Sequence, residues 1–191
     1  VGCNEPAFLG AITGSNSKIN FLRSMETVFH KKSKLIENNA SFDDFFDIFK
    51  KELFSDLERA YEYDNFYNKQ RAQDINYISS LVFNDCIENA KSLTQGGGNT
   101  VIASPMCLGI TNVIDSLCVV KQFVFDEKLF PMSELIAALK ADWQGYEDMR
   151  MLILKKGKFF GNDDDTSNYI AQKLYRELYD FLKDKTNLYG Y

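Results

Sequence analysis

The stretch 95–105, QGGGNTVIASP, decides the fold class, because it carries the clearest strand signal in a chain whose other patterns are mostly helical. Its glycines predict a tight turn, and the β-branched run TVIAS predicts a short buried strand that ends at Pro105. A strongly apolar helical pattern follows at 109–128. A turn, a strand and a helix in this order are typical of a parallel α/β architecture.

Helical periodicity accounts for most of the remaining sequence. Ser41 and Asp44 have the spacing of a capping box, and the apolar stripe after them predicts a long helix with one buried face. That stripe consists of Phe42, Phe45, Phe46, Phe49 and Leu53. Further helices are predicted at 18–31, 80–91, 133–143, 146–156 and 166–184. The fold class is therefore expected to be α/β and helix-rich.

Two polar motifs admit a ligand-binding interpretation and a plainer structural one. GNDDD at 161–165 offers carboxylates to a hard cation, but it lacks the glycine and the terminal glutamate of a calcium loop. Capping of the final helix is favoured, because its positive N-terminal end attracts these aspartates. QGGGNT at 95–100 offers amides to a phosphate, but no lysine follows at the P-loop spacing. A tight turn is favoured there.

Two further residues have ordinary structural interpretations. Gly157 follows the predicted helix 146–156 and is expected to end it. Trp143 is the single tryptophan of the chain, and an aromatic core anchor is its default role.

The overall composition limits the class of protein. The chain has 191 residues, 45% of them hydrophobic, and a net charge of −5, which indicates a packed globular protein without a nucleic-acid surface. No apolar run approaches the ~20 residues that cross a bilayer, and no signal peptide is recognisable. We expect a cytoplasmic protein. Because the chain begins with Val1, we expect it to be a piece of a longer polypeptide.

Cys3, Cys86, Cys107 and Cys118 have no spacing typical of a zinc site or a CxxC redox pair. Cys86 and Cys118 lie in apolar helical patterns and are expected to be small buried hydrophobes. The single histidine, His30, would have to reach Cys3 across the fold to make a nucleophilic pair, so an ordinary cysteine hydrolase is disfavoured.

The stretch 1–6, VGCNEP, presents chemically active groups in an unusual setting. In an extended segment Cys3 and Glu5 project to the same side, with Cα atoms about 7 Å apart. Gly2 and Pro6 restrict and shape the backbone around them. A thiol and a carboxylate presented together suggest hydrogen-atom or proton transfer on one small molecule, although such triplets also arise by chance.

Five motifs, taken in order, resemble those of the glycyl-radical enzyme family. They are GCNEP at 2–6, FNDCIENAKSLTQGGGN at 83–99, GITNVIDSLCVVKQFVFDEK at 109–128, ALKADWQGYEDMRMLILK at 138–155 and KFFGNDDD at 158–165. The order and approximate spacing are similar along nearly all of the chain. The resemblance implies that 1–191 is part of a ten-stranded α/β barrel of the pyruvate formate-lyase type, beginning at the cysteine loop and lacking the radical-glycine domain.

The resemblance also implies a chemistry. In this family a glycyl radical passes its unpaired electron to the loop cysteine, here Cys3, whose thiyl radical takes a hydrogen atom from a substrate carbon. Glu5 is the implied base for a substrate hydroxyl next to the radical carbon. Loss of water, an amine or sulfite from the neighbouring carbon then makes the enzyme a dehydratase or C–X lyase.

Cofactor and partners follow from the same resemblance. No cofactor or metal is expected in this segment. The parent is expected to need a glycyl radical, installed by an activating enzyme that uses S-adenosylmethionine and an iron–sulfur cluster, and to act as a homodimer on a small polar organic substrate. The segment alone is expected to be inactive and to expose barrel surface.

Some positions depart from the family pattern. The upstream half is missing. Gly190 stands before Tyr191, as the radical glycine of the family stands before a tyrosine. However, the usual arginine is absent, and Gly190 follows the motif at 161–165 too closely. Gly190 is therefore not expected to be the radical site. The loop 6–17 lacks the acidic and aromatic residues of the diol and choline enzymes, so no substrate is assigned.

Two alternatives stay open. The branch that includes glycerol dehydratase and choline trimethylamine-lyase fits better than a formate acetyltransferase, which carries adjacent cysteines where this chain has Cys3 and Asn4. A helical interaction module without chemistry, in which Cys3 and Glu5 are incidental, is the second alternative.

Overall fold

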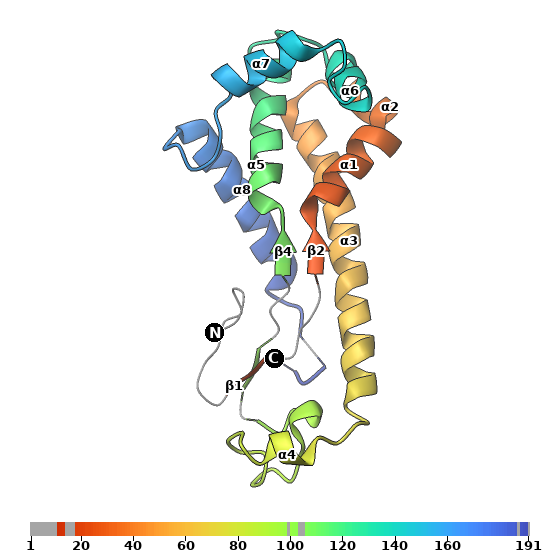
Figure 1. Ribbon diagram of the computed structural model, residues 1–191, viewed down its shortest axis with the longest axis vertical. Helices are drawn as coiled ribbons and strands as arrows, with labels where there is room; N and C mark the ends of the chain where they lie inside the picture. Colours follow the sequence, from red (N-terminus) through yellow and green to blue (C-terminus); the bar gives the residue numbers. More distant parts are fainter. Residues whose placement is uncertain (1–10, 14–17, 99, 103–105, 187, 191) are drawn as a thin grey trace. The chain divides into compact units, whose positions relative to one another are not determined.

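The computed structural model describes residues 11–13, 18–98, 100–102, 106–186 and 188–190, and it divides into two compact units (Figure 1). Unit 1 consists of Val1–Ile19, Leu57–Cys107 and Asp184–Tyr191, and unit 2 of Asn20–Asp56 and Leu108–Lys183. Helix α3 (Phe42–Arg71) contributes its first half to unit 2 and its second half to unit 1.

Unit 2 is a helical assembly. Besides the first half of α3 it contains α1 (Phe21–Lys31), α2 (Ser33–Ile36), α5 (Ile110–Val119), α6 (Met132–Lys140), α7 (Glu147–Lys156) and α8 (Asp165–Leu182). A π-helical segment η2 (Val120–Asp126) continues α5. Figure 1 shows α5, in green, between α8 and α1, and both of these helices contact α5.

The core of unit 2 is built largely from phenylalanine. The predicted stripe of α3 is buried along its whole length, and Phe29 of α1 packs against Phe45 with the ring centroids 5.7 Å apart. The capping box at the start of α3 is confirmed, because the Asp44 carboxylate accepts from the Ser41 amide at 3.0 Å. The Ser41 hydroxyl accepts in turn from the Asp44 amide at 3.2 Å. Sequence pattern and packing therefore agree for this helix.

A buried glutamine joins η2 to the chain that leaves α7. Gln122 is 6% exposed, and its Nε2 donates to the Lys156 carbonyl at 3.1 Å and to Glu127 Oε1 at 2.7 Å. Its Oε1 accepts from the Lys158 amide at 3.1 Å. One side-chain amide thereby pairs with two main-chain groups on either side of Gly157, which fixes where the chain turns away from the helix.

Gly157 ends α7 as predicted, but the reason is steric and not a left-handed backbone. Its backbone is extended, with φ −66° and ψ 138°, and not left-handed. A Cβ atom would lie 2.6 Å from the Ile153 carbonyl oxygen and 2.6 Å from Cζ of Phe159. Only glycine fits between this carbonyl and this ring.

Unit 1 holds short strands and turns. Strand β1 (Ala11–Thr13) pairs in parallel with β3 (Thr100–Ile102), in the register Ala11 with Thr100 and Thr13 with Ile102. Besides the second half of α3, this unit contains α4 (Tyr77–Ser80) and the 3-10 turn η1 (Leu93–Gln95). Where the chain passes between the units, β2 (Lys18–Asn20) pairs with β4 (Met106–Leu108). The predicted parallel α/β character is confirmed by the β1–β3 pair.

Three helix predictions need correction. Residues 18–20 form β2 and not the first turn of a helix, because Asn20 caps α1 by accepting from the Leu22 amide at 3.1 Å. The predicted helix 80–91 is wrong: α4 ends at Ser80, and turns follow with Asp85 (φ 69°) and Ala90 (φ 50°) in left-handed conformations. Left-handed residues interrupt the helical hydrogen-bond ladder whatever the apolar pattern.

The third correction concerns the helix predicted at 133–143, since α6 ends at Lys140. The Trp143 amide donates to the Ala138 carbonyl at 2.9 Å and the Asp142 amide donates to the Leu139 carbonyl at 3.2 Å. These two bonds form a Schellman motif, which ends a helix by reversing the chain. Within the described part of the chain, none of the helices combines the length and apolar character that a bilayer crossing requires.

Candidate functional site

The two predicted catalytic residues, Cys3 and Glu5, lie outside the described residues. The structure does describe the strands that follow two of the predicted motifs. The cysteine loop precedes β1 and the glycine motif precedes β3, and these strands are parallel neighbours. Because parallel strands run in the same direction, the chain enters both strands at the same end of the pair.

The glycine motif is a tightly packed turn. The Gly97 amide donates to the Ser92 carbonyl at 2.9 Å, and the Gly97 carbonyl accepts from the Asn89 side chain at 2.8 Å. A Cβ on Gly97 would lie 2.1 Å from the Lys91 carbonyl oxygen, so no other residue fits. The main-chain groups at Gly97 are therefore engaged within the protein, and the prediction of a tight turn is confirmed.

A tyrosine from the far end of the chain closes this turn. Tyr189 donates from its hydroxyl to the Thr94 carbonyl at 2.7 Å. Its ring lies against Gly96, whose φ is 73°, and a Cβ there would approach the ring to 2.5 Å. Burial raises the pKa of the Tyr189 phenol, against an opposing effect of Arg71. Tyr189 thus packs within unit 1. The expectation that Gly190 is not the radical site stays a prediction.

The cysteines that the structure describes are poor nucleophiles. Cys86 and Cys118 are 3% and 0% exposed, as predicted, although Cys86 lies in a turn and not in a helix. Burial raises the pKa of the Cys107 thiol and raises that of Cys118 to about 12. A nucleophilic thiol needs a lowered pKa and access to its substrate, so none of these three cysteines has the environment of a reactive nucleophile.

GNDDD caps the last helix. Asp164 Oδ1 accepts from the Thr166 amide at 2.9 Å and from the Ser167 amide at 3.1 Å. The capping interpretation of the motif is confirmed, and α8 begins at Asp165, one residue earlier than predicted.

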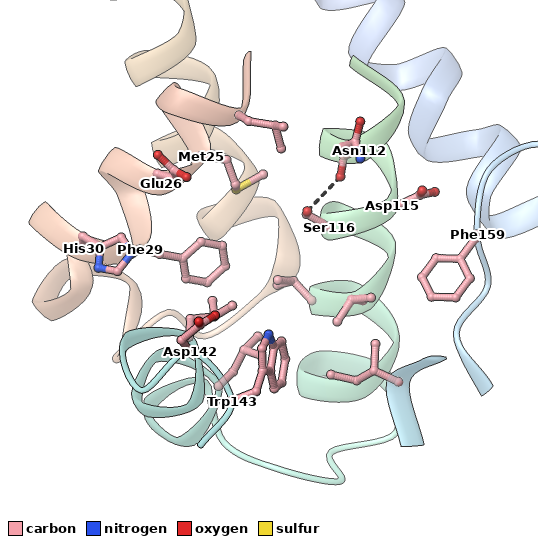
Figure 2. A pocket seen from close by; sticks show the side chains of 16 residues that line it. Met25, Glu26, Phe29, His30, Asn112, Asp115, Ser116, Asp142, Trp143 and Phe159 are labelled. Carbon is pink, nitrogen blue, oxygen red and sulfur yellow. Dashed lines mark hydrogen bonds between the residues drawn. The ribbon is translucent and has the colours of Figure 1, made fainter. Parts of the chain in front are cut away.

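Unit 2 contains a cavity of about 490 Å³ that the sequence did not indicate (Figure 2). Helices α1, α5, α6 and α7 and the turn after α6 supply its walls. Figure 2 shows Met25 and Phe29 projecting from α1 toward α5, with Asp142 and Trp143 entering from the turn. His30, exposed on α1, lies at its edge. The prediction that His30 makes no pair with Cys3 involves an undescribed residue and stays a prediction.

Trp143 is not the fully buried anchor that its residue type suggests. Its side chain is half-buried in the cavity wall, and its φ of 67° follows a φ of 48° at Asp142. Two successive left-handed residues without glycine are uncommon, and a bulky residue in that region is strained. The Schellman motif at the end of α6 holds the tryptophan there.

Comparison with known proteins identifies the family. The family model described as pyruvate formate lyase-like matches residues 1–191. The chain belongs to the pyruvate formate lyase-like family. Its resemblance to the glycyl-radical enzymes is thereby confirmed, as is its fold class, a helix-rich part of the barrel of this family.

Similar proteins include a dehydratase and a lyase. Trans-4-hydroxy-L-proline dehydratase of Clostridioides difficile is 30% identical over 154 residues, which cover 80% of this chain and 20% of that protein. Isethionate sulfite-lyase of Desulfovibrio desulfuricans is 32% identical over 141 residues, covering 71% and 17%.

A solved structure described as 1,2-propanediol dehydration in Roseburia inulinivorans matches with a TM-score of 0.87 at 27% identity. The match covers 100% of this chain and 26% of that one. The chain therefore spans about a quarter or less of the length of these relatives.

Proposed function

We propose that the chain is part of a glycyl-radical lyase that removes a leaving group from a small polar organic substrate. The observation that carries the proposal is the family match over 1–191, together with relatives whose names are dehydratase and sulfite-lyase. The domain is a partial barrel that begins at the cysteine loop, and the radical glycine belongs to another segment of the parent protein.

Cys3 is the proposed hydrogen-atom relay. Its thiyl radical takes a hydrogen atom from a substrate carbon, so that one C–H bond breaks and one S–H bond forms. The described cysteines support this choice by exclusion, because Cys86 and Cys118 are buried and Cys107 is half-buried in β4. A thiol that meets substrate has to be reachable, and only the loop cysteine matches the family motif.

Glu5 is the proposed base. It accepts the proton of a hydroxyl next to the radical carbon, which raises electron density there and helps the neighbouring carbon to expel its substituent. Dehydration involves no net oxidation or reduction, so the product radical has to recover a hydrogen atom from the Cys3 thiol. This return regenerates the thiyl radical for the next turnover.

The partners of the parent protein belong to the same proposal. An activating enzyme that uses S-adenosylmethionine and an iron–sulfur cluster would install the glycyl radical, and the parent would work as a cytoplasmic homodimer without oxygen. The leaving group is water, an amine or sulfite. A formate acetyltransferase is disfavoured because Asn4 stands where adjacent cysteines would be required.

The test uses the full parent protein, made without oxygen together with its activating enzyme. Turnover is measured across diols, choline, isethionate and hydroxyproline, and the radical is followed by electron paramagnetic resonance. Cys3→Ser is expected to abolish turnover of the active substrate while the glycyl radical still forms, and Glu5→Gln to reduce turnover strongly.

Cys107→Ser and Glu62→Gln are the matched controls, since both leave the motif untouched, and both are expected to keep wild-type turnover. Retained turnover in Cys3→Ser would refute the relay assignment. Formation of formate from a 2-keto acid and coenzyme A would favour the acetyltransferase alternative.

A further inference from the structure

The cavity of unit 2 has an apolar floor. Met25, Phe29, Val120, Leu135 and Ile153 line it, and each of these side chains is 7% exposed or less. Such a surface gains free energy by covering an alkyl group. The volume of about 490 Å³ lies within the range of small-molecule sites, about 300–1,000 Å³.

Carboxylates predominate among the titratable groups at this cavity. Glu26, Asp115 and Asp142 line it together with His30 at the edge, and neither lysine nor arginine is among the described residues that do so. Asp115 Oδ1 accepts from the Phe160 amide at 2.8 Å. Within the described part of the chain, Glu26 and Asp142 form no ion pair with a basic side chain. The cavity therefore favours a cation.

The arrangement of the carboxylates favours a diffuse organic ion over a metal ion. Among the described residues no group of three or more histidine, cysteine, aspartate or glutamate side chains could hold a metal ion. The carboxylates are instead spread over α1, α5 and the turn after α6 (Figure 2). Dispersed carboxylates suit an ammonium group that carries alkyl substituents, which needs no close coordination.

Trp143 adds an aromatic face to this site. An indole attracts an ammonium ion placed over it, more strongly than the other aromatic side chains do. The left-handed backbone at Asp142 and Trp143 brings a carboxylate and the indole to the cavity from adjacent positions. Strained backbone of this kind persists where the surrounding structure holds it, here through the bond from the Trp143 amide to the Ala138 carbonyl.

We propose that this cavity binds an organic ammonium ion with a short alkyl chain, the alkyl group on the floor of Met25 and Phe29 and the cationic head between Glu26, Asp142 and the indole of Trp143. This site uses neither Cys3 nor Glu5. Its occupancy is therefore independent of the proposed lyase activity, and it can be tested without that activity.

The test is a calorimetric titration of the purified parent protein, and the variants below assign the signal to this cavity. Hexyltrimethylammonium is expected to bind saturably. Hexan-1-ol and hexanoate, with the same alkyl chain and a neutral or negative head, are expected to bind at least fivefold more weakly. Equal responses to the three probes, or no saturation, would overturn the proposal.

Variants locate the binding site. Glu26→Gln and Asp142→Asn are each expected to raise the dissociation constant about twofold to fivefold, as loss of an exposed charge pair does. Asparagine tolerates left-handed backbone, so the turn is kept. Glu62→Gln and Asp148→Asn are the matched controls and should bind as the wild type does. Trp143→Phe, followed by calorimetry, should also bind more weakly. Unchanged binding in all three cavity variants would place the cation elsewhere and refute the assignment.

Discussion

The buried amide of Gln122 offers the sharpest test of how unit 2 is held together. Gln122→Leu keeps a side chain of similar volume and removes every polar atom of the amide. The variant breaks the bonds to the Lys156 carbonyl, the Lys158 amide and the Glu127 carboxylate at once. It also leaves these three groups without the partner that Gln122 supplies.

The expected loss follows from these three bonds. Each main-chain bond contributes about 1 kcal/mol, and the bond to a carboxylate about 1.5–3 kcal/mol when fully shielded. Glu127 is exposed, as are Lys156 and Lys158, so water replaces part of what is lost. We expect the free energy of unfolding to fall by about 2–4 kcal/mol, which corresponds to about 4–16 °C in melting temperature for a chain of this size.

Two measurements check this expectation. Urea denaturation gives the change in unfolding free energy. Hydrogen exchange reports on the Lys158 amide, which should exchange faster in the variant. The amides of α8, in the same unit, should change less. Gln144→Leu, at an exposed glutamine in the turn after α6, is the matched control and should change stability by less than about 0.5 kcal/mol. A Gln122→Leu variant as stable as this control, with unchanged exchange at Lys158, would refute the reasoning.

Two further predictions concern a glycine and a cysteine. Gly97→Ala forces a Cβ to within 2.1 Å of the Lys91 carbonyl oxygen and should cost about 1–3 kcal/mol of unfolding free energy. Gly145 has a φ of 80° and open space around it, so Gly145→Ala should cost only the strain of a left-handed backbone, about 1 kcal/mol. If urea denaturation showed a larger loss for Gly145→Ala than for Gly97→Ala, the packing at Gly97 would be contradicted. The Cys118 thiol has a pKa of about 12 in the folded chain and an ordinary value near 8.5 when unfolded. Its contribution to the free energy of unfolding is therefore fully present below about pH 8.5 and is progressively lost as the pH rises toward 12. Between pH 8 and 10 the wild type should therefore lose about 2 kcal/mol more than Cys118→Ala, and parallel losses would argue against a buried thiol.

Sequence patterns correctly predicted those elements whose defining contacts join residues close together in the chain. The capping box of Ser41 and Asp44, the phenylalanine stripe after it and the capping of α8 by GNDDD depend on residues within one or two turns of each other, so spacing alone identifies them. The same holds for the strand at 100–102 after its glycines. Motif order along the chain predicted the family, which the match over 1–191 confirmed.

The features that the sequence did not predict depend on contacts between residues far apart in the chain. The apolar pattern at 80–91 is helical in period, yet its chain is broken by left-handed Asp85 and Ala90 beside a glycine turn that Tyr189 closes. No sequence window relates Gln122 to Lys158, which are hydrogen-bonded, or Trp143 to Phe29, which line the same cavity, because only the packing of the helices brings these residues together. The amino-acid sequence by itself determined most of the helices, the caps of α3 and α8 and the family. Only the tertiary structure decided the cavity and its charge, since a cavity forms where side chains remote in the chain fail to fill the space between helices.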